Sequence, residues 1–389
     1  MVYLDYQSAK PVEPEVIAAM NPYMIEKYGN ASSLHEIGDW SSEALDTSRM
    51  IIADFVNARE PEEIIFTSGA TEANNLAIIG YALRNRQKGK HLIISEVEHI
   101  SIHNIAKYLR KNGFEVSIVP VDYTGTVRLD KLEERIRPDT ILISIQHASN
   151  EIGTIQPIMS IGKIARERKI VFHVDAVASE GQIPIDVQRD FIDMLTLSSN
   201  DIYGPRGVGA LYVRKGILLN PLIIGGGQER GLRSGTEDVA AIVGFAKAAE
   251  LALKYLPEES KRLQQLRDKA IKKVLETIPR SYLNGHKTNR LPNNAHFRFD
   301  FIEGESILLS FKELGIAVAT GSACSSQTLE PSHTLISLGL LHEEAHGSLE
   351  ITMGRLTTEA DINKFLEALP GIVKRLRDMS PLTKTEVGM

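Results

Sequence analysis

The strongest constraint on the fold is an alternation of short apolar runs with amphipathic stretches. Runs at 92–95, 140–145 and 170–174 are rich in β-branched residues, and helical patterns lie between the runs. Strands that alternate with helices are typical of βαβ units, which build a mostly parallel sheet. The runs 191–197 and 209–213 have little helix between them, so we expect part of this sheet to be antiparallel.

The pattern changes after about residue 236, where two long helical segments meet at Pro257. Proline removes a backbone N–H, so it predicts a break between the two helices. Shorter strands and further helices follow. We expect an α/β fold with a large domain over residues 12–250 and a small α+β domain built from residues 1–11 and 251–389.

Charge and hydropathy exclude several classes of protein. The net charge is −6, which argues against a nucleic-acid partner because such proteins favour a basic face. The sequence holds no apolar run of about 18 residues, so no membrane span is expected. The first residues lack a basic segment followed by an apolar one, so no signal peptide is expected and a cytoplasmic location follows.

Two strand ends carry residues that suit a ligand. Residues 67–71, Thr-Ser-Gly-Ala-Thr, lie between an apolar strand and a helix. Such a turn either binds phosphate through backbone N–H groups or simply caps the helix. Asp175 ends another apolar strand, where ligands bind in parallel sheets. Its carboxylate either holds a protonated heterocycle nitrogen or caps a helix.

Two histidine patterns resemble metal sites but carry little weight. His342 to His346 reads H-E-x-x-H, the pattern of zinc proteases, yet glycines bracket it within less than two helical turns. A charged surface segment is the better interpretation. His99 and His103 are four residues apart, but no acidic residue completes a site.

The chain has one cysteine, Cys324, so it cannot form an intramolecular disulfide. Its neighbours, residues 320–326, are small and polar, whereas a buried structural cysteine usually has bulky apolar neighbours. We therefore expect an exposed thiol on a loop.

Taken together, the motifs resemble the cysteine desulfurases of iron–sulfur cluster assembly, which are fold-type-I enzymes that use pyridoxal 5′-phosphate (PLP). The likeness covers nearly the whole chain. The matching motifs are Tyr3-Leu-Asp-Tyr6, Phe66-Thr-Ser-Gly-Ala-Thr-Glu72, Glu98-His99, Asn150-Glu-Ile-Gly153, His173-Val-Asp-Ala176, Ile202-Tyr-Gly-Pro205, Arg233-Ser-Gly-Thr236, Gly321-Ser-Ala-Cys324 and Gly354-Arg355.

This resemblance implies a role for each matching residue. Thr71 and Ser198 would bind the PLP phosphate, and Thr236 would reach the phosphate of the neighbouring subunit in a homodimer. His99 would stack on the pyridine ring and act in catalysis, Asp175 would pair with the ring nitrogen, and Asn150 would contact the ring oxygen or the substrate. Arg355 would clamp the carboxylate of L-cysteine. Cys324 would carry persulfide sulfur from L-cysteine to a scaffold protein.

The sequence departs from the family where PLP would bind. The family has a Ser-x-His-Lys run whose lysine binds PLP covalently, and here the run reads Ser198-Ser-Asn200-Asp201. Ala178 replaces a glutamine, and Lys10 lies in a run that reads Ala-Thr-Thr-Pro in the family. A carboxylate cannot replace the lysine, which also transfers protons. Any PLP would then bind non-covalently or through Lys10, although a Lys10–Asp201 salt bridge is the favoured interpretation.

Two functions remain open at this point. The protein is either a PLP-dependent desulfurase, or a catalytically impaired homologue that docks a scaffold protein. In the second case Cys324 would be a ligand to a 2Fe–2S cluster shared with the scaffold, because an exposed thiolate is a soft iron ligand.

Overall fold

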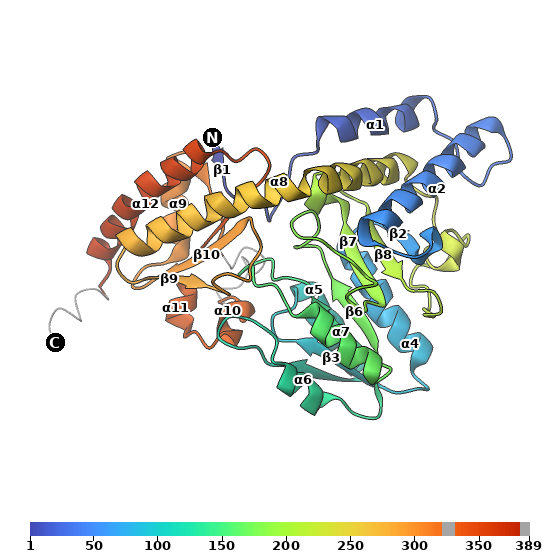
Figure 1. Cartoon of the computed structure of the whole chain (residues 1–389), viewed down its shortest axis with the longest axis horizontal. Coiled ribbons are helices and arrows are strands. Elements are labelled where there is room, and N and C mark those ends of the chain that lie inside the picture. The colour runs from blue at the N-terminus through green and yellow to red at the C-terminus, as the bar shows by residue number, and fades with distance from the viewer. Residues whose placement is uncertain (321–330, 382–389) are drawn as a thin grey trace.

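The computed structural model describes residues 1–320 and 331–381. Its larger part is built on a seven-stranded sheet (Figure 1). The order is β2 (Ile64–Thr67), β8 (Gly209–Val213), β7 (Met194–Ser198), β6 (Val171–Asp175), β5 (Thr140–Gln146), β3 (His91–Ser95) and β4 (Glu115–Val119). β8 is antiparallel to both of its neighbours, β2 and β7, and every other neighbouring pair is parallel. This arrangement confirms the expected mixed sheet.

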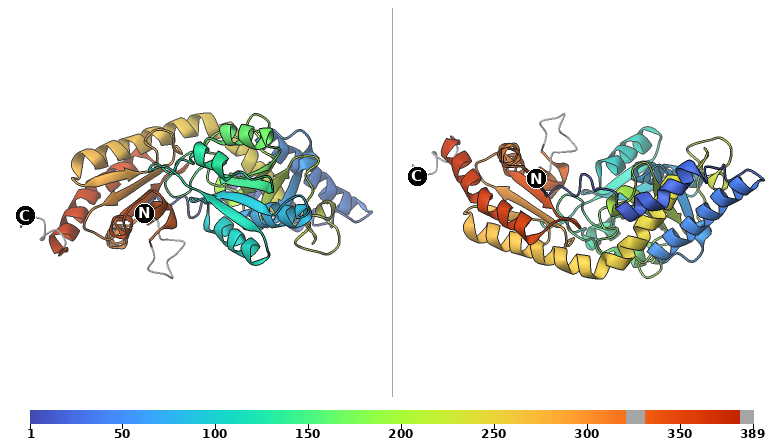
Figure 2. Two further views of the ribbon diagram at one scale, coloured as in Figure 1. Left: turned by 90° about the horizontal axis from the view of Figure 1, so that it is seen from below. Right: turned by 90° about the horizontal axis from the view of Figure 1, so that it is seen from above.

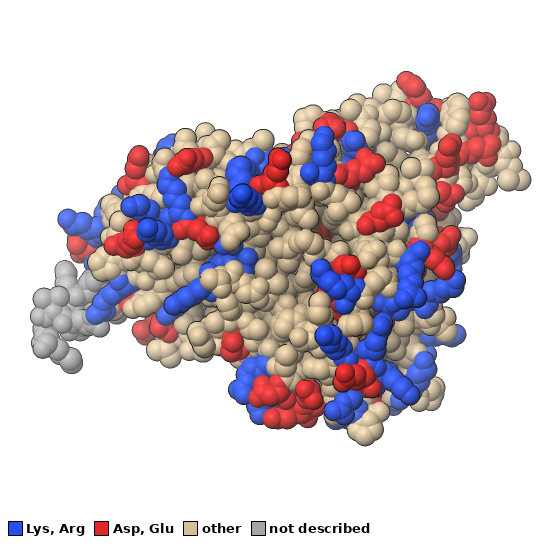
Figure 3. Space-filling view, viewed as in Figure 1, with Lys and Arg blue, Asp and Glu red and all other residues tan. Residues whose placement is uncertain are grey.

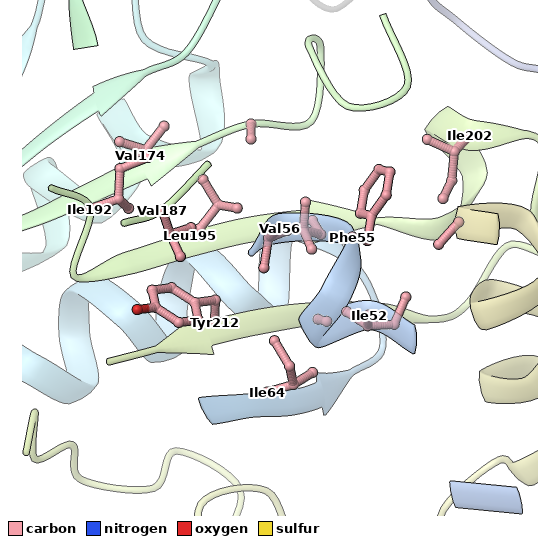
Figure 4. Packing of buried hydrophobic residues seen from close by; sticks show 14 of the residues in the cluster. Ile52, Phe55, Val56, Ile64, Val174, Val187, Ile192, Leu195, Ile202 and Tyr212 are labelled. Atoms are coloured by element: carbon pink, nitrogen blue, oxygen red, sulfur yellow. The ribbon is translucent and has the colours of Figure 1, made fainter. Parts of the chain in front are cut away.

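Helices cover both faces of this sheet. On one face, apolar side chains of a long N-terminal helix, among them Ile52 and Phe55, pack with Ile64, Leu195 and Tyr212 of the strands (Figure 4). Burial of these side chains is the main force that holds helix and sheet together. The helices of this part are α1 (Pro14–Ile25), α2 (Glu36–Val56), α3 (Ala70–Asn75), α4 (Tyr81–Asn85), α5 (Ile100–Lys111), α6 (Leu129–Arg135) and α7 (Ile158–Glu167).

The smaller part has its own apolar core, in which the rings of Phe311 and Phe365 stack with centroids 5.1 Å apart. A three-stranded antiparallel sheet and a two-stranded parallel one contribute to it. The strands are β1 (Val2–Tyr3), β9 (Ser281–Asn284), β10 (Asn294–Phe299), β11 (Ile316–Ala317) and β12 (Ser348–Thr352). The helices are α9 (Gly304–Glu313), α10 (His333–Ser337), α11 (His342–His346) and α12 (Glu359–Met379).

One continuous helix, α8 (Val239–Thr277), runs along both parts (Figure 2). The break predicted at Pro257 is therefore wrong. Proline costs the helix one hydrogen bond, but the two ends of α8 are held in different cores, by residues such as Phe245 and Leu263. The expected domain boundary at residue 250 falls inside this helix, and the division into domains stays a prediction.

The surface carries charges of both signs. On the face shown in Figure 3, lysines and arginines are interspersed with aspartates and glutamates, and neither sign covers the face alone. Within residues 1–320 and 331–381, no helix combines the length and the apolar character that crossing a membrane requires.

Candidate active site

A cavity of about 980 Å³ opens at the carboxyl ends of β5 and β6. Ligands of open α/β sheets bind at such strand ends. Residues from the starts of α3 and α5 and from β12 also line it, together with residues near 7–8, 200–201, 319–320 and 331–337. Eight of the residues singled out from the sequence line this cavity: Thr71, His99, His103, Asn150, Asp175, Ala178, Asn200 and Asp201.

Asp175 is fixed at the base of the cavity by two hydrogen bonds. The Asn74 side-chain amide donates to one carboxylate oxygen at 2.8 Å, and the backbone N–H of Val177 donates to the other at 3.1 Å. Asp175 is 7% exposed and Asn74 is 1% exposed. Sequence reasoning missed Asn74, although its position three residues after Thr71, one turn along α3, could have indicated it.

Thr71 and His99 lie at the starts of two helices on the cavity wall. Thr71 is the second residue of α3 and follows Gly69, whose φ of 144° favours glycine. His99 caps α5: its Nδ1 accepts a hydrogen bond from the Ser101 backbone N–H at 3.2 Å and lies 2.8 Å from the Ser101 hydroxyl. Both side chains are thus placed beside the helix N-termini, where backbone N–H groups favour anions.

Lys10 lies behind Asp201 and not in the cavity lining. Its ammonium donates a hydrogen bond to the backbone carbonyl of Asp201 and lies 4.0 Å from the carboxylate. The two side chains are 3% and 10% exposed. Burial raises the pKa of Asp201, and the charge of Lys10 lowers it again. The predicted Lys10–Asp201 salt bridge is confirmed.

Glu180 adds a further acidic group beside this pair. One of its carboxylate oxygens accepts a hydrogen bond from the Ser198 backbone N–H at 2.8 Å, and the other has no hydrogen-bond partner in the described part of the chain. Burial and the nearby Asp201 raise the pKa of Glu180 well above its ordinary value. Ser198 itself is buried and does not line the cavity.

Arg355 does not point into the cavity, so the geometry does not support its expected role as a clamp for a substrate carboxylate. Its guanidinium donates to Glu13 at 2.7 Å and to Glu259 at 2.9 Å, and it packs over the ring of Tyr203. Its backbone N–H donates to the Tyr203 hydroxyl at 2.7 Å. The guanidinium instead connects the N-terminal segment, α8 and the segment after β12.

The remaining predicted residues lie elsewhere. Thr236 is exposed and outside the cavity lining. Cys324 lies outside the described residues. His342 and His346 lie on the short helix α11, and within residues 1–320 and 331–381 no three His, Cys, Asp or Glu side chains are placed to hold a metal. His103, which does line the cavity, donates to the backbone carbonyl of Glu96 at 3.2 Å.

Sequence reasoning missed three buried acids that line the same cavity. Glu98 accepts from the Gln146 backbone N–H at 3.0 Å, and burial raises its pKa to about 8. Glu151 accepts from the Ser332 hydroxyl at 2.7 Å, and burial raises its pKa to about 7. Burial also raises the pKa of Glu350 well above its ordinary value. A charged residue between the apolar Leu349 and Ile351 could have revealed the last of them.

The comparisons with known proteins agree with this architecture. The model of the class-V aminotransferase family matches residues 2–365. The cysteine desulfurase IscS 1 of Archaeoglobus fulgidus is 58% identical over 98% of this chain and 99% of its own length. The cysteine desulfurase IscS of Methanosarcina thermophila is 51% identical over 99% of this chain and 95% of its own length. The structure of a NifS-like protein superposes with a TM-score of 0.90 at 34% identity, covering 96% of this chain and all of that one.

The chain belongs to the class-V aminotransferase family, within its cysteine desulfurases. The resemblance found in the sequence and the expected fold-type-I architecture are therefore confirmed. PLP is the cofactor expected of this family.

The cavity of this family member fits PLP only in part. The Asp175 carboxylate could accept a hydrogen bond from the protonated ring nitrogen of PLP. Thr71 lies at the start of a helix, where backbone N–H groups favour a phosphate. Bound PLP would supply an electron sink. However, the Asp201 carboxylate in the lining cannot form an imine with PLP, and the only lysine in the described lining is Lys107. The described lining thus offers residues that could hold the ring, with Lys107 as its one amine.

Proposed function

We propose that this desulfurase-family protein serves iron–sulfur cluster assembly through the thiol of Cys324, and does not cleave the carbon–sulfur bond of L-cysteine. In this role it docks a scaffold protein in the cytoplasm, and Cys324 becomes a ligand to a 2Fe–2S cluster that the scaffold carries. The observation that carries the proposal is the buried Lys10–Asp201 pair, which we take to stand in place of the cofactor lysine.

The charge of the cavity supports the same conclusion. Asp201 and Glu350 place carboxyl groups in the lining, and no arginine is among the described lining residues. L-cysteine carries a carboxylate and PLP carries a phosphate, so both anionic groups would lie near acidic side chains. Binding either anion tightly would need a cationic side chain instead. A desulfurase reaction at neutral pH therefore lacks both its lysine and a guanidinium for the substrate.

The anchors on either side of residues 321–330 support a role for Cys324. Before this segment, Ala319 exchanges two backbone hydrogen bonds of 3.1 and 2.9 Å with Glu350. After it, the Ser332 hydroxyl donates to Glu151 and the His333 ring donates to the Glu98 carbonyl at 3.0 Å. The described residues that flank 321–330, Thr320 and Pro331, therefore line the cavity.

The absence of covalent PLP is tested by the absorption spectrum of the purified protein with added PLP. We expect the spectrum of the free cofactor, and on addition of L-cysteine the same change that free PLP shows without protein, because Asp201 cannot attach the cofactor. A band of covalently bound PLP that disappears in Lys10→Ala would overturn this part of the proposal. Lys215→Ala, which changes an exposed lysine paired with Glu60, is the matched control.

The role of Cys324 is tested by anaerobic reconstitution of a 2Fe–2S cluster on an iron–sulfur scaffold protein. We expect the wild-type chain to slow the loss of the cluster's visible absorption, and Cys324→Ser to remove this protection. Equal cluster lifetimes with both chains would contradict the proposal. Because both chains keep the docking surface, their binding to the scaffold should be equal.

The second candidate is an active desulfurase in which Lys10 replaces the missing lysine. The observation in its favour is that the Lys10 ammonium reaches Asp201 from behind the cavity. Release of sulfide from L-cysteine by the wild-type chain, lost in Lys10→Ala, would establish it in place of the first proposal.

A homodimer is part of the proposal, supported by exposed apolar residues. Leu222, Ile223 and Ile224 are 37%, 42% and 87% exposed and precede Thr236 in one segment. In Figure 1 this yellow-green segment lies at the end of the molecule opposite the C-terminus. Exposed apolar side chains grouped in this way favour an interface with another chain.

A further inference from the structure

A second pocket, of about 350 Å³, lies between α1, α2 and α8 and is referred to as the three-helix pocket. α1 and α2 both pack against α8 (Figure 1). The pocket shares no described lining residue with the cavity at the carboxyl ends of β5 and β6. A ligand of the three-helix pocket would therefore bind apart from the candidate active site.

The three-helix pocket exists because each of the helices contributes a small side chain to it. These are Ala19 of α1, Ala44 of α2 and Ala246 of α8. Beside the pocket the helices are already in close contact, since a Cβ atom added to Gly244 would lie 2.7 Å from Sδ of Met20. The helices therefore cannot move together to fill the space. Its volume is near the lower end of the range for ligand pockets, about 300–1,000 Å³, and suits a molecule with one ring.

Two aromatic side chains and a lysine form one side of the three-helix pocket. The Lys27 ammonium lies 5.7 Å from the ring centroid of Tyr23 and 6.0 Å from that of Trp40. Within residues 1–320 and 331–381 no carboxylate pairs with Lys27, so its charge is balanced by the ring faces alone. An aromatic ligand would offer this ammonium a further ring face and would pack on the edges of Tyr23 and Trp40. A saturated ring of the same size offers neither contact.

Ser48 gives the three-helix pocket a buried polar group. It is 3% exposed and lines the pocket, and its hydroxyl has no hydrogen-bond partner in the described part of the chain. A buried hydroxyl without a partner is unfavourable, and this group can both donate and accept a hydrogen bond. A ligand with one hydroxyl or ring N–H would satisfy it.

The charges of the lining favour an uncharged ligand. Lys27 and Lys247 are matched by Glu43 and Glu250. The Lys247 ammonium lies 3.3 Å from the Glu250 carboxylate and 3.8 Å from that of Glu15, so it is already paired. A charged ligand would lose hydration in the pocket without gaining a net counter-charge.

We propose that the three-helix pocket binds a small uncharged aromatic molecule of the phenol or indole type, with its ring beside Tyr23 and Trp40 and its polar group at Ser48. The proposal goes beyond the function proposed above and does not depend on it, because the pocket shares no described lining residue with the candidate active site.

The test uses the fluorescence of Trp40, which is the only tryptophan of the chain and lines the pocket. The full wild-type chain is titrated with phenol, cyclohexanol, benzoate and benzylamine, and isothermal titration gives the affinities. We expect phenol to change the fluorescence and to bind at least about tenfold more tightly than the other three probes. Equal binding of phenol and cyclohexanol, tighter binding of either charged probe, or no binding of phenol at millimolar concentration would overturn the proposal.

Substitutions then locate the site. We expect Ala19→Leu, which fills the pocket, and Ser48→Ala, which removes the hydroxyl, each to weaken phenol binding about tenfold. Toluene, which has no hydroxyl, should bind to Ser48→Ala as it does to the wild type. The matched controls are Ala18→Leu on α1 and Ser42→Ala on α2, which lie outside the pocket lining and should leave phenol binding unchanged. Undiminished phenol binding in both pocket variants would place the ligand elsewhere and refute the assignment.

Discussion

At the scale of single residues, we propose that Asp201 stands where the family has its cofactor lysine, which changes the chemistry while the fold around it is kept. Asp201 stays buried because Lys10 compensates its charge. The neighbouring Ser198 hydroxyl also lowers the pKa of Asp201 through a hydrogen bond. The site has thereby become a structural ion pair.

We predict that Lys10→Ala lowers the free energy of unfolding by about 3 kcal/mol, because it leaves a buried carboxylate without its partner. Asp201→Asn in the same chain should restore part of the loss, since it removes the unpaired charge. Urea unfolding of the single and double variants measures both effects. A Lys10→Ala chain as stable as the wild type would show that the pair is not a structural element.

Glu98 gives a pH-dependent prediction at the same scale. Burial raises the pKa of its carboxyl to about 8 in the folded protein, from an ordinary value of 4.5. The folded chain therefore holds a proton that the unfolded chain has lost, and stability falls as the pH rises through about 8. The buried His173, with its pKa lowered to about 3 by burial, affects stability only below its ordinary pKa of 6.5.

We therefore expect the Tm of the wild type to fall between about pH 6.5 and about pH 8.5, and Glu98→Gln to reduce this fall. Part of the fall should remain, because burial also raises the pKa of Glu151 to about 7. Thermal unfolding at the two pH values is the measurement. An equal fall of Tm in both chains would be inconsistent with a raised pKa at Glu98.

At the scale of elements, Arg355 joins three segments that lie far apart in the sequence. It connects the residues before α1, through Glu13, with α8, through Glu259. Its aromatic neighbours are Tyr203 and Tyr255, with the guanidinium carbon 4.4 and 4.8 Å from the ring centroids.

We predict that Arg355→Ala lowers the free energy of unfolding by about 2–3 kcal/mol, because two carboxylates lose their partner. Denaturant unfolding, with Arg84→Ala as an exposed control, measures this loss. An Arg355→Ala chain as stable as the wild type would show that these ion pairs do not hold the three segments together.

The sequence predicts much of the architecture and part of the site. The alternation of strands and helices was sufficient to predict the mixed sheet, because the period of apolar residues along the chain depends on local backbone geometry. Pro257 was misleading because tertiary packing on both halves of α8 outweighs a local preference. The ion pairs of Arg355 were not predicted because its partners, Glu13 and Glu259, are distant in the sequence. Glu350 was missed because only the fold brings β12 to the cavity.

At the scale of the whole molecule, the proposed homodimer gives a further prediction. Ile224→Glu places a charge at the most exposed residue of the apolar segment 222–224 and should shift the chain toward the monomer. Sedimentation velocity measures this shift. Leu314→Glu, at a 48% exposed position in the smaller part, is the control and should stay dimeric. A wild-type chain that sediments as a monomer would refute the dimer.

The central claim is that the molecule keeps the desulfurase fold without the desulfurase reaction. The most direct measurement is the release of sulfide from L-cysteine by the purified full chain with added PLP and a thiol reductant. The account predicts no release above the background without protein. Sulfide release that grows with protein concentration and disappears in Cys324→Ser would contradict it.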